Sequence, residues 1–243
     1  MSKLKKISTN PPKSINKDFA EQEIQRLKAE LFELQNMLFA TKKHSILIIL
    51  QAMDAGGKDG TIRNVFSCVN PMGCLVKSFK APTEEESAHD FLWRIHPHSP
   101  AKGMMQIFNR SQYEDILVPT VHKTLDKKII EKRYERINRF EENLAYNKTK
   151  ILKFYLHISE EEQAQRLEER QNDPAKKWKH DPNDMTEAKI RHKYMEVYEQ
   201  VFKECSPDIP WLIVPADQKW YRNYFILNEI VTLMRSLKMS YPE

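Results

Sequence analysis

The sequence of 243 residues predicts an α/β fold, a three-layer α/β/α domain built on a five-stranded parallel sheet. Two observations support this fold class. Five short apolar segments alternate with longer stretches whose apolar residues recur at helical spacing, which is typical of strands joined by crossover helices. In addition, three of the five glycines of the chain lie in one loop directly after the first apolar segment.

The first expected strand, residues 45–50, is an almost unbroken aliphatic run, as in strands that are buried on both faces of a parallel sheet. The other expected strands cover residues 74–79, 104–108, 151–158 and 211–214. Thr83 and Ser159 each precede a run of acids, a combination that favours a helix start. The expected helices cover residues 18–41, 58–69, 84–96, 126–146, 160–170, 185–205 and 219–237.

Composition limits the class of protein. Residues 1–17 are rich in Lys, Ser, Asn and Pro, so we expect them to be disordered or draped on the surface of a single domain, residues 18–243. No run approaches the ~18 apolar residues of a membrane span, and the first residues lack the apolar part of a secretory signal. The three cysteines have no metal-ligand spacing and fit reduced thiols in the cytoplasm.

The glycine-rich loop predicts a phosphate site. Gly57 and Lys58 match the Walker A pattern G-x-x-x-x-G-K-[ST], whereas Ala52 replaces its first glycine and Asp59 its Ser/Thr. Backbone N–H groups and the helix dipole at such a loop attract an anion, and the lysine adds a full charge. The alternative, a plain glycine turn with a solvated lysine, is disfavoured because strand, glycines, lysine and helix agree in order. The expected phosphate ligands in this loop are Ala55, Gly56, Gly57, Lys58, Asp59, Gly60, Thr61 and Arg63.

Acids near the loop indicate a divalent cation, Mg²⁺ or Mn²⁺ in its place. Asp54 and Asp59 lie in a loop that otherwise suits anions, and the third expected strand ends at Asn109 and Arg110. Because ligands bind beyond the carboxyl ends of parallel strands, these residues should face the loop. The expected metal ligands are Asp54, Asn109 and Asp115, and the expected nucleotide ligands are Arg94, Asn109, Arg110, Glu114 and Asp115. A simple capped helix start at Ser111 is the alternative for this cluster.

Basic residues gather in two further segments. Residues 123–139 carry seven Lys/Arg against three acids, which suits a polyanion, although a solvated helix face explains any single one of them equally well. Residues 168–192 are polar, basic and interrupted by proline, as in a mobile lid. The alternation of strands and helices, the glycine loop after the first strand and this lid together predict a P-loop kinase. Further expected phosphate ligands are Lys80, Arg133, Lys176, Lys177 and Lys179, and the expected catalytic residues are Asp54, Lys58, Arg110 and Arg170.

Several segments resemble the polyphosphate kinase 2 family in the same order: AMDAGGKDGTIRNVF, SFKAPTEEE, IFNRSQYEDIL, PAKKWK and PWLIVPADQKWYRN. The resemblance covers about Phe39 to the C-terminal helix. It implies a thymidylate-kinase-like fold and reversible, Mg²⁺-dependent transfer of phosphate between inorganic polyphosphate and nucleotides. It also implies that Asp54 and Lys58 are the loop aspartate and catalytic lysine, with Arg110 after strand three and Arg170 in the lid.

Some positions depart from the family pattern. Many members have Asp where this chain has Asn109, and Asn followed by Tyr-Glu-Asp resembles the subgroup that acts on both nucleoside mono- and diphosphates. That subgroup usually has Ala in place of Gly56 and Arg in place of Thr120. The second lid helix has Ala188, Arg191 and His192 where an Arg and a Trp-Asp pair are more usual.

We therefore expect an enzyme, a polyphosphate:nucleotide phosphotransferase acting on AMP and ADP or GMP and GDP. An ATP-dependent nucleoside monophosphate kinase is the alternative, and a non-catalytic polyphosphate- or nucleotide-binding protein would require a broken metal site. Nucleic acid is disfavoured because no aromatic stacking platform or recognition helix accompanies the basic residues. We expect a homo-oligomer, either a dimer or a tetramer, with no membrane partner.

Overall fold

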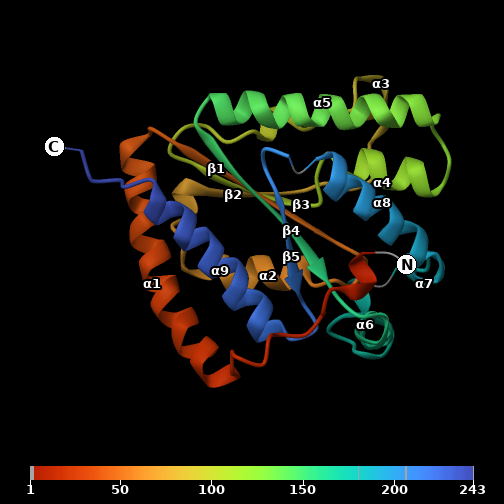
Figure 1. Ribbon diagram of the computed structural model, residues 1–243, viewed down its shortest axis with the longest axis horizontal. Helices are drawn as coiled ribbons and strands as arrows, with labels where there is room; N and C mark the ends of the chain where they lie inside the picture. The colour runs from red at the N-terminus through yellow and green to blue at the C-terminus, as the bar shows by residue number, and fades with distance from the viewer. Residues whose placement is uncertain (1–2, 180, 206, 243) are drawn as a thin grey trace.

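The computed structural model describes residues 3–179, 181–205 and 207–242. A sheet of five parallel strands in the order β2-β3-β1-β4-β5 lies between two layers of helices (Figure 1). The strands are β1 (Ser45–Ala52), β2 (Cys74–Ser78), β3 (Met105–Asn109), β4 (Thr149–His157) and β5 (Trp211–Pro215). The predicted three-layer α/β/α fold is thus confirmed.

The central strand β1 explains the two cores. All eight of its residues are buried. Ile46, Ile48 and Leu50 belong to one hydrophobic core, whereas Leu47 and Ile49 belong to the other, because successive side chains of a strand point to opposite faces. A strand that is buried on both sides needs apolar residues at every position, which is why the sequence shows a continuous run rather than alternation.

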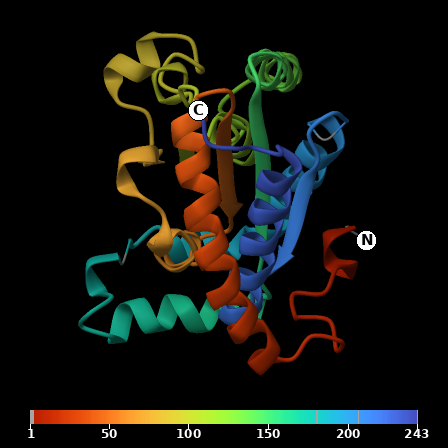
Figure 2. The ribbon, with the colours of Figure 1, turned by 90° about the vertical axis from the view of Figure 1, so that its left-hand side faces the viewer.

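Each core is covered by its own helices. The first face carries α1 (Lys17–Thr41), α2 (Lys58–Val65) and α9 (Lys219–Ser236), and Figure 2 shows α1 and α9 side by side. The second face carries α4 (Glu114–Val121), α5 (Lys127–Tyr146) and α8 (Arg191–Glu204). The remaining α-helices are α3 (Glu84–Ala88), α6 (Glu160–Asn172) and α7 (Asp184–Lys189), and α6 projects from one end of the body (Figures 1 and 2). Short 3₁₀ helices cover Leu4–Lys6, Phe66–Cys68, Pro71–Gly73, His96–His98 and Lys177–Lys179.

Three helices differ from the sequence-based expectation. The helix after Thr83 has this residue as its N-cap, as predicted, within a capping box, but it ends at Ala88 instead of about His96. Asp90 Oδ1 accepts a hydrogen bond from the backbone N–H of Leu92, at 3.0 Å, and thereby offers the chain a turn in place of further helix. The helix expected over residues 185–205 is divided into α7 and α8 at Ile190, where φ is −102° and ψ is 17°. Helix α4 was not predicted as a separate element.

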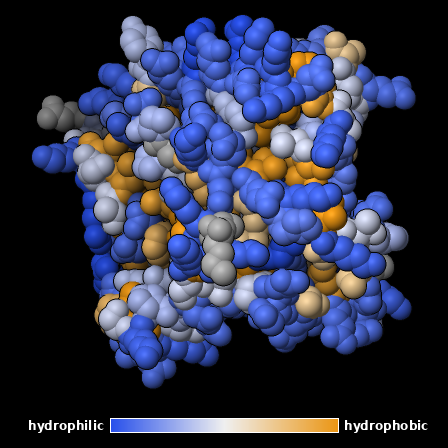
Figure 3. Space-filling view, turned by 45° about the vertical axis from the view of Figure 1, so that its right-hand side comes forward, coloured by the Kyte–Doolittle hydropathy of each residue, from blue (hydrophilic) through white to orange (hydrophobic). Residues whose placement is uncertain are grey.

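The N-terminal segment lies against the domain. Leu4 is 1% exposed and belongs to the core on the α5 side, and its N–H donates to Glu199 at 2.6 Å. The Thr9 hydroxyl donates to Asp217 Oδ2, also at 2.6 Å. Figure 3 shows the molecule turned by 45° from Figure 1. This face is largely hydrophilic, with hydrophobic side chains exposed across its middle. Within the described part of the chain, every helix is too short or too polar to cross a membrane.

A buried ion pair joins four segments on the second face. Lys153 of β4 is 0% exposed, and its Nζ donates to Glu141 Oε2 of α5 at 2.6 Å, to the Cys205 carbonyl at 2.6 Å and to the Tyr113 hydroxyl at 3.1 Å. Glu141 Oε1 accepts hydrogen bonds from Tyr113 Oη at 2.7 Å and from Gln112 Nε2 at 3.0 Å. All three protons of the ammonium group therefore have an acceptor, which is the condition for burying a charge without a large penalty.

Replacing Lys153 by Met should destabilise the protein by about 3–5 kcal/mol, because it leaves Glu141 as an unpaired buried charge. Adding Glu141→Leu should recover part of that loss, since the second replacement removes the stranded carboxylate. Urea denaturation of both variants measures the difference. A double variant no more stable than the Lys153→Met variant would contradict the assignment of the cost to an unpaired charge.

Candidate active site

The loop between β1 and α2 has the backbone of an anion cradle. Ala55 has φ of 58° and Gly57 has φ of 98°, and Gly57 is the N-cap of α2. The positive φ strains any other residue at Gly57, and a Cβ there would lie 2.3 Å from Arg222 Nη1, so the end of that side chain would have to move. At Gly56 a Cβ would lie 2.4 Å from the Cβ of Ala52, so alanine at this position would require the loop to shift.

Lys58 opens α2 and is buried, with 9% of its surface exposed. Its Nζ donates to the Ala52 carbonyl at 3.2 Å. Burial and the nearby Arg110 lower the pKa of Lys58 to about 8, while Asp54 and two further carboxylates, those of Glu114 and Asp59, act in the opposite direction. A phosphate bound at the loop would add negative charge and raise this pKa again, so ligand binding and protonation of Lys58 favour each other.

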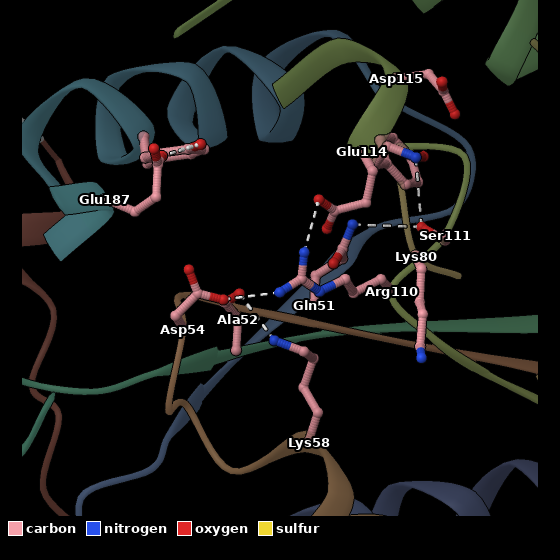
Figure 4. Close-up of polar contacts among 12 residues, drawn as sticks. Gln51, Ala52, Asp54, Lys58, Lys80, Arg110, Ser111, Glu114, Asp115 and Glu187 are labelled. Carbon is pink, nitrogen blue, oxygen red and sulfur yellow. Dashed lines mark hydrogen bonds and ion pairs between the residues drawn. The ribbon is translucent and has the colours of Figure 1, made fainter. Parts of the chain in front are cut away.

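Arg110 faces the loop from the end of β3. Its Nη2 donates to Asp54 Oδ1 at 2.7 Å, and its Nη1 lies 3.5 Å from a carboxylate oxygen of Glu114. Figure 4 shows Lys58, Asp54 and Arg110 pointing toward one another above the loop. The φ of Arg110 is 64°, a left-handed conformation that costs a non-glycine residue free energy and is therefore held by its surroundings. Glu114, more than Asp54, raises the pKa of Arg110, although burial opposes them.

Two carboxylates near Lys58 suit a magnesium ion carried by a phosphate substrate. Asn109 Nδ2 donates to Asp59 Oδ1 at 2.8 Å, which ties the end of β3 to the first turn of α2. Among the described residues, no hydrogen bond engages Asp54 Oδ2. Mg²⁺ typically takes one or two carboxylates together with water and substrate phosphate, so Asp54 and Asp59 fit this donor set. No group of three or more His, Cys, Asp or Glu among the described residues has the arrangement of a complete metal cage.

The structure does not bring Asp115 to Asp54, and the predicted metal set of Asp54, Asn109 and Asp115 is not assembled. Asp115 Oδ2 instead accepts a hydrogen bond from Arg94 Nη2 at 2.8 Å. Asp115 and Glu114 are adjacent at the start of α4, so their side chains leave the helix in different directions, and Glu114 is the one that reaches Arg110. Figure 4 shows Asp115 on the far side of Glu114 from Asp54.

Arg94, Asp115 and Arg133 form a second cluster beside the loop. Arg94 is 5% exposed, and its Nη1 donates to the Lys80 carbonyl at 2.8 Å. Arg133, which the sequence assigned to polyphosphate, donates to the Asp115 carbonyl, and its guanidinium lies 4.7 Å from the centre of the Phe91 ring. Burial raises the pKa of Asp115, and Arg94 opposes it. The expected nucleotide ligands therefore divide between this cluster and Arg110.

The predicted lid residues are held by acids rather than by the loop. Arg170 of α6 donates to Asp184 of α7 at 2.7 Å, and Lys176 donates to Glu169 at 2.9 Å. Burial raises the pKa of Asp184, and the negative charge of Asp54 in the loop raises it further. This part of the lid is therefore close enough to the loop for the two carboxylates to interact. Lys177 is exposed, and the side chain of Lys179 lies outside the described part of the structure.

Thr61, Arg63 and Gly60, which were also expected to bind phosphate, lie in different surroundings. The Thr61 hydroxyl donates to the Gly57 carbonyl at 3.1 Å, so it stabilises α2 instead of facing the loop. Arg63 is exposed, and a Cβ on Gly60 would meet Arg222 Nη2 at an ordinary 3.7 Å.

Two arginines that the sequence did not single out lie behind the loop. Arg166 Nη1 donates to the Ala55 carbonyl at 3.2 Å, and Arg222 lies against Gly57. Both are on amphipathic helices, α6 and α9, where arginine is usually solvated. The signal in the sequence is the family resemblance of two segments, EEEQAQRLEER, which contains Arg166, and PWLIVPADQKWYRN, which contains Arg222.

Comparisons with known proteins agree with this geometry. A protein-family model described as Polyphosphate kinase 2 (PPK2) matches residues 14–243. The AMP/ADP-polyphosphate phosphotransferase of Meiothermus ruber is 47% identical over 218 residues, 89% of this chain and 82% of that protein. The ADP-polyphosphate phosphotransferase of Rhodopseudomonas palustris is 43% identical over 226 residues, 88% of this chain and 78% of that protein. The crystal structure of polyphosphate kinase 2 from Arthrobacter aurescens TC1 superposes with a TM-score of 0.94 and 38% identity, covering 98% of this chain and 86% of that one.

Gly57→Ala should destabilise the protein by at least about 1–2 kcal/mol and abolish most activity, because alanine is strained at this φ and its Cβ would displace the Arg222 guanidinium behind the loop. Gly60→Ala is the matched control for stability, since this glycine is inside α2 and has room for a Cβ. It should be neutral or stabilising by up to ~1 kcal/mol. Thermal unfolding measures both, and equal melting temperatures for the two variants would contradict the strained loop.

Proposed function

Because the chain belongs to the polyphosphate kinase 2 family, as its sequence predicted, we propose that it transfers the terminal phosphate of inorganic polyphosphate to nucleoside mono- and diphosphates. AMP and ADP are the proposed acceptors, with GMP and GDP as alternatives. The observation that carries the proposal is the convergence of Lys58 and Arg110 on Asp54 above the phosphate loop. The cytoplasm is the proposed compartment, and all three cysteines are free.

The residues of the site supply positioning and charge. The terminal phosphate of the donor binds at the N-terminus of α2, where Lys58 and the backbone N–H groups neutralise it. Arg110 reaches the same space from β3 and stabilises charge on the group in transfer. The acceptor phosphate has a pKa near 6 and is already ionised, so no side chain has to remove a proton from it.

We propose Mg²⁺, or Mn²⁺ in its place, as the metal, held by Asp54 and Asp59. When bound, the ion supplies positive charge to the phosphate oxygens. Asn109 orients Asp59 through its 2.8 Å hydrogen bond, so an amide at this position supports a metal ligand without being one.

The second cluster suits the acceptor. Arg94 and Lys80 lie on the β2–β3 side of the loop, and Arg94 is fixed by Asp115 and by the Lys80 carbonyl. A buried, preorganised arginine loses little entropy when it binds a phosphate or a carboxylate, which makes it suited to orient a nucleotide. The alternative, an ATP-dependent nucleoside monophosphate kinase, differs in the donor alone and is not favoured by the relatives, which are polyphosphate phosphotransferases.

Purified protein with Mg²⁺, AMP or ADP and inorganic polyphosphate should produce ADP or ATP. Lys58→Ala should lower kcat by roughly 10²–10³-fold, because it removes a charge from the group in transfer. Lys150→Ala is the control, since Lys150 is exposed on β4 at the end of the sheet away from the loop. Phosphorylation of AMP by ATP with none from polyphosphate would establish the competing function.

Asp54→Asn should raise the Mg²⁺ concentration needed for half-maximal activity about tenfold or more, because one anionic ligand of the ion is lost. Asp115→Asn tests the alternative ligand that the sequence suggested. It should leave the Mg²⁺ requirement unchanged and alter KM for the nucleotide instead, since Asp115 holds Arg94. Metal titrations of activity at fixed nucleotide distinguish them, and a larger metal effect at Asp115 would reverse the assignment.

A further inference from the structure

Two side chains of α6 hold the backbone of the phosphate loop at Ala55. Gln163 Nε2 donates to the Asp54 carbonyl at 3.0 Å, and Arg166 Nη1 donates to the Ala55 carbonyl at 3.2 Å. Positions 163 and 166 are three apart, so both side chains lie on one face of the helix. Their acceptors belong to the two peptide groups on either side of the Ala55 Cα, where φ is 58°. A non-glycine residue keeps such a conformation only where its surroundings fix it, and α6 supplies this constraint.

The contact at Asp54 joins the proposed metal ligand to the loop. The carboxylate of Asp54 faces Arg110, whereas its carbonyl is turned toward Gln163. Because a peptide group is planar and trans, holding this carbonyl oxygen also sets the direction of the Ala55 N–H on its other side. A Mg²⁺ ion that is shared by a carboxylate and a phosphate tolerates little departure from octahedral geometry. A contact that fixes the Asp54 backbone therefore bears on the place of the metal.

Gln163 is itself held in one orientation by Arg191. The glutamine is 2% exposed, and its Oε1 accepts a hydrogen bond from Arg191 Nη1 at 2.6 Å. Since only the oxygen end of the amide can meet a guanidinium, the nitrogen end is left to face the Asp54 carbonyl. Arg191 is 6% exposed and also donates to the Ile158 carbonyl, and among the described residues it makes no ion pair. Two neutral acceptors thus hold this arginine.

Arg191 stands at the base of the predicted lid, residues 168–192. It is the first residue of α8 and directly follows the junction with α7 at Ile190. Its acceptors are Ile158, which precedes α6, and Gln163, which is the fourth residue of α6. One guanidinium therefore fastens the start of α8 to the start of α6. Figure 1 shows α6, α7 and α8 on the same side of the molecule.

We propose that Gln163 and Arg191 are positioning residues of the phosphotransfer site. Arg191 orients the Gln163 amide, and Gln163 fixes the Asp54 backbone in the position from which the carboxylate holds the metal beside the phosphate loop. The inference rests on the proposed function, because metal and phosphate belong to that reaction, whereas the constraint on the loop backbone does not depend on it. Both side chains are more than nine-tenths buried, so they act through Asp54 and not through contact with a substrate.

Gln163→Glu separates the two contacts of this side chain. Glutamate has nearly the same volume and still accepts from Arg191, now as an ion pair, but it has no N–H for the Asp54 carbonyl. The variant should unfold near the temperature of the unmodified protein. Hydrogen–deuterium exchange of residues 53–57 should rise several-fold, and the Mg²⁺ concentration for half-maximal activity on the order of tenfold. Gln165→Glu makes the same change at an exposed position of α6 and should alter neither quantity.

Two further comparisons test how the residues act together. Arg191→Met leaves the Gln163 amide free to rotate, so exchange of the loop and the Mg²⁺ requirement should both rise, and Arg191→Lys, which keeps a donor, should restore part of each. In an Asp54→Asn background, Gln163→Glu should raise the Mg²⁺ requirement less than about twofold, because the carboxylate that it positions is gone.

Unchanged exchange of residues 53–57 in Gln163→Glu, or effects of Gln163→Glu and Asp54→Asn that multiply in full, would overturn the proposal and leave the phosphotransferase function in place. An Arg191→Met variant that only lowers the melting temperature would overturn the role of Arg191. If the unmodified enzyme uses no polyphosphate, the proposed function fails, while exchange of the loop still reports whether Gln163 holds it. If Gln163→Glu does not fold, the same two measurements on the Arg191 variants decide the question.

Discussion

The contact of Lys153 with Glu141 is the interaction on which the catalytic half of the molecule depends. It crosses from β4 to α5, and Glu141 extends the connection to Gln112 and Tyr113. These two residues follow Arg110 by two and three positions, so the buried carboxylate fixes the segment whose first residue has φ of 64°. A strained backbone persists only when its surroundings determine it, and this network provides that constraint.

The charged side chains of the site also have partners within the protein. Arg110 is occupied by Asp54 and Glu114, and Lys58 by a carbonyl. A phosphate that binds at the loop therefore replaces partners that Arg110 and Lys58 already have within the protein. The proposed metal ion would replace Arg110 as the partner of Asp54, so this carboxylate would have a partner both before and after the substrate binds. The cations of the site are thus in place for an anion, and their pairing keeps the cost of burying them small when no anion is bound.

Much of the fold followed from the sequence because strands buried on both faces have a distinctive apolar pattern, and because glycine is rare in this chain. The glycine loop, Lys58 and Arg110 were found through local pattern and spacing. Asp115 was placed with the metal because two adjacent acids on a helix look alike in a sequence, and the orientation of α4 decides which one faces the loop. Arg166 and Arg222 were missed because α6 and α9 become neighbours of the loop through tertiary packing alone.

The N-terminal segment has a consequence for the order in which the protein is completed. Leu4 and Thr9 are separated from their partners Glu199 and Asp217 by 195 and 208 positions in the sequence. A loop of that length is slow to close, and it gains nothing until α8 and the chain after β5 exist. Leu4 and Thr9 must therefore be among the last residues to find their native contacts, and their docking marks the completion of the fold.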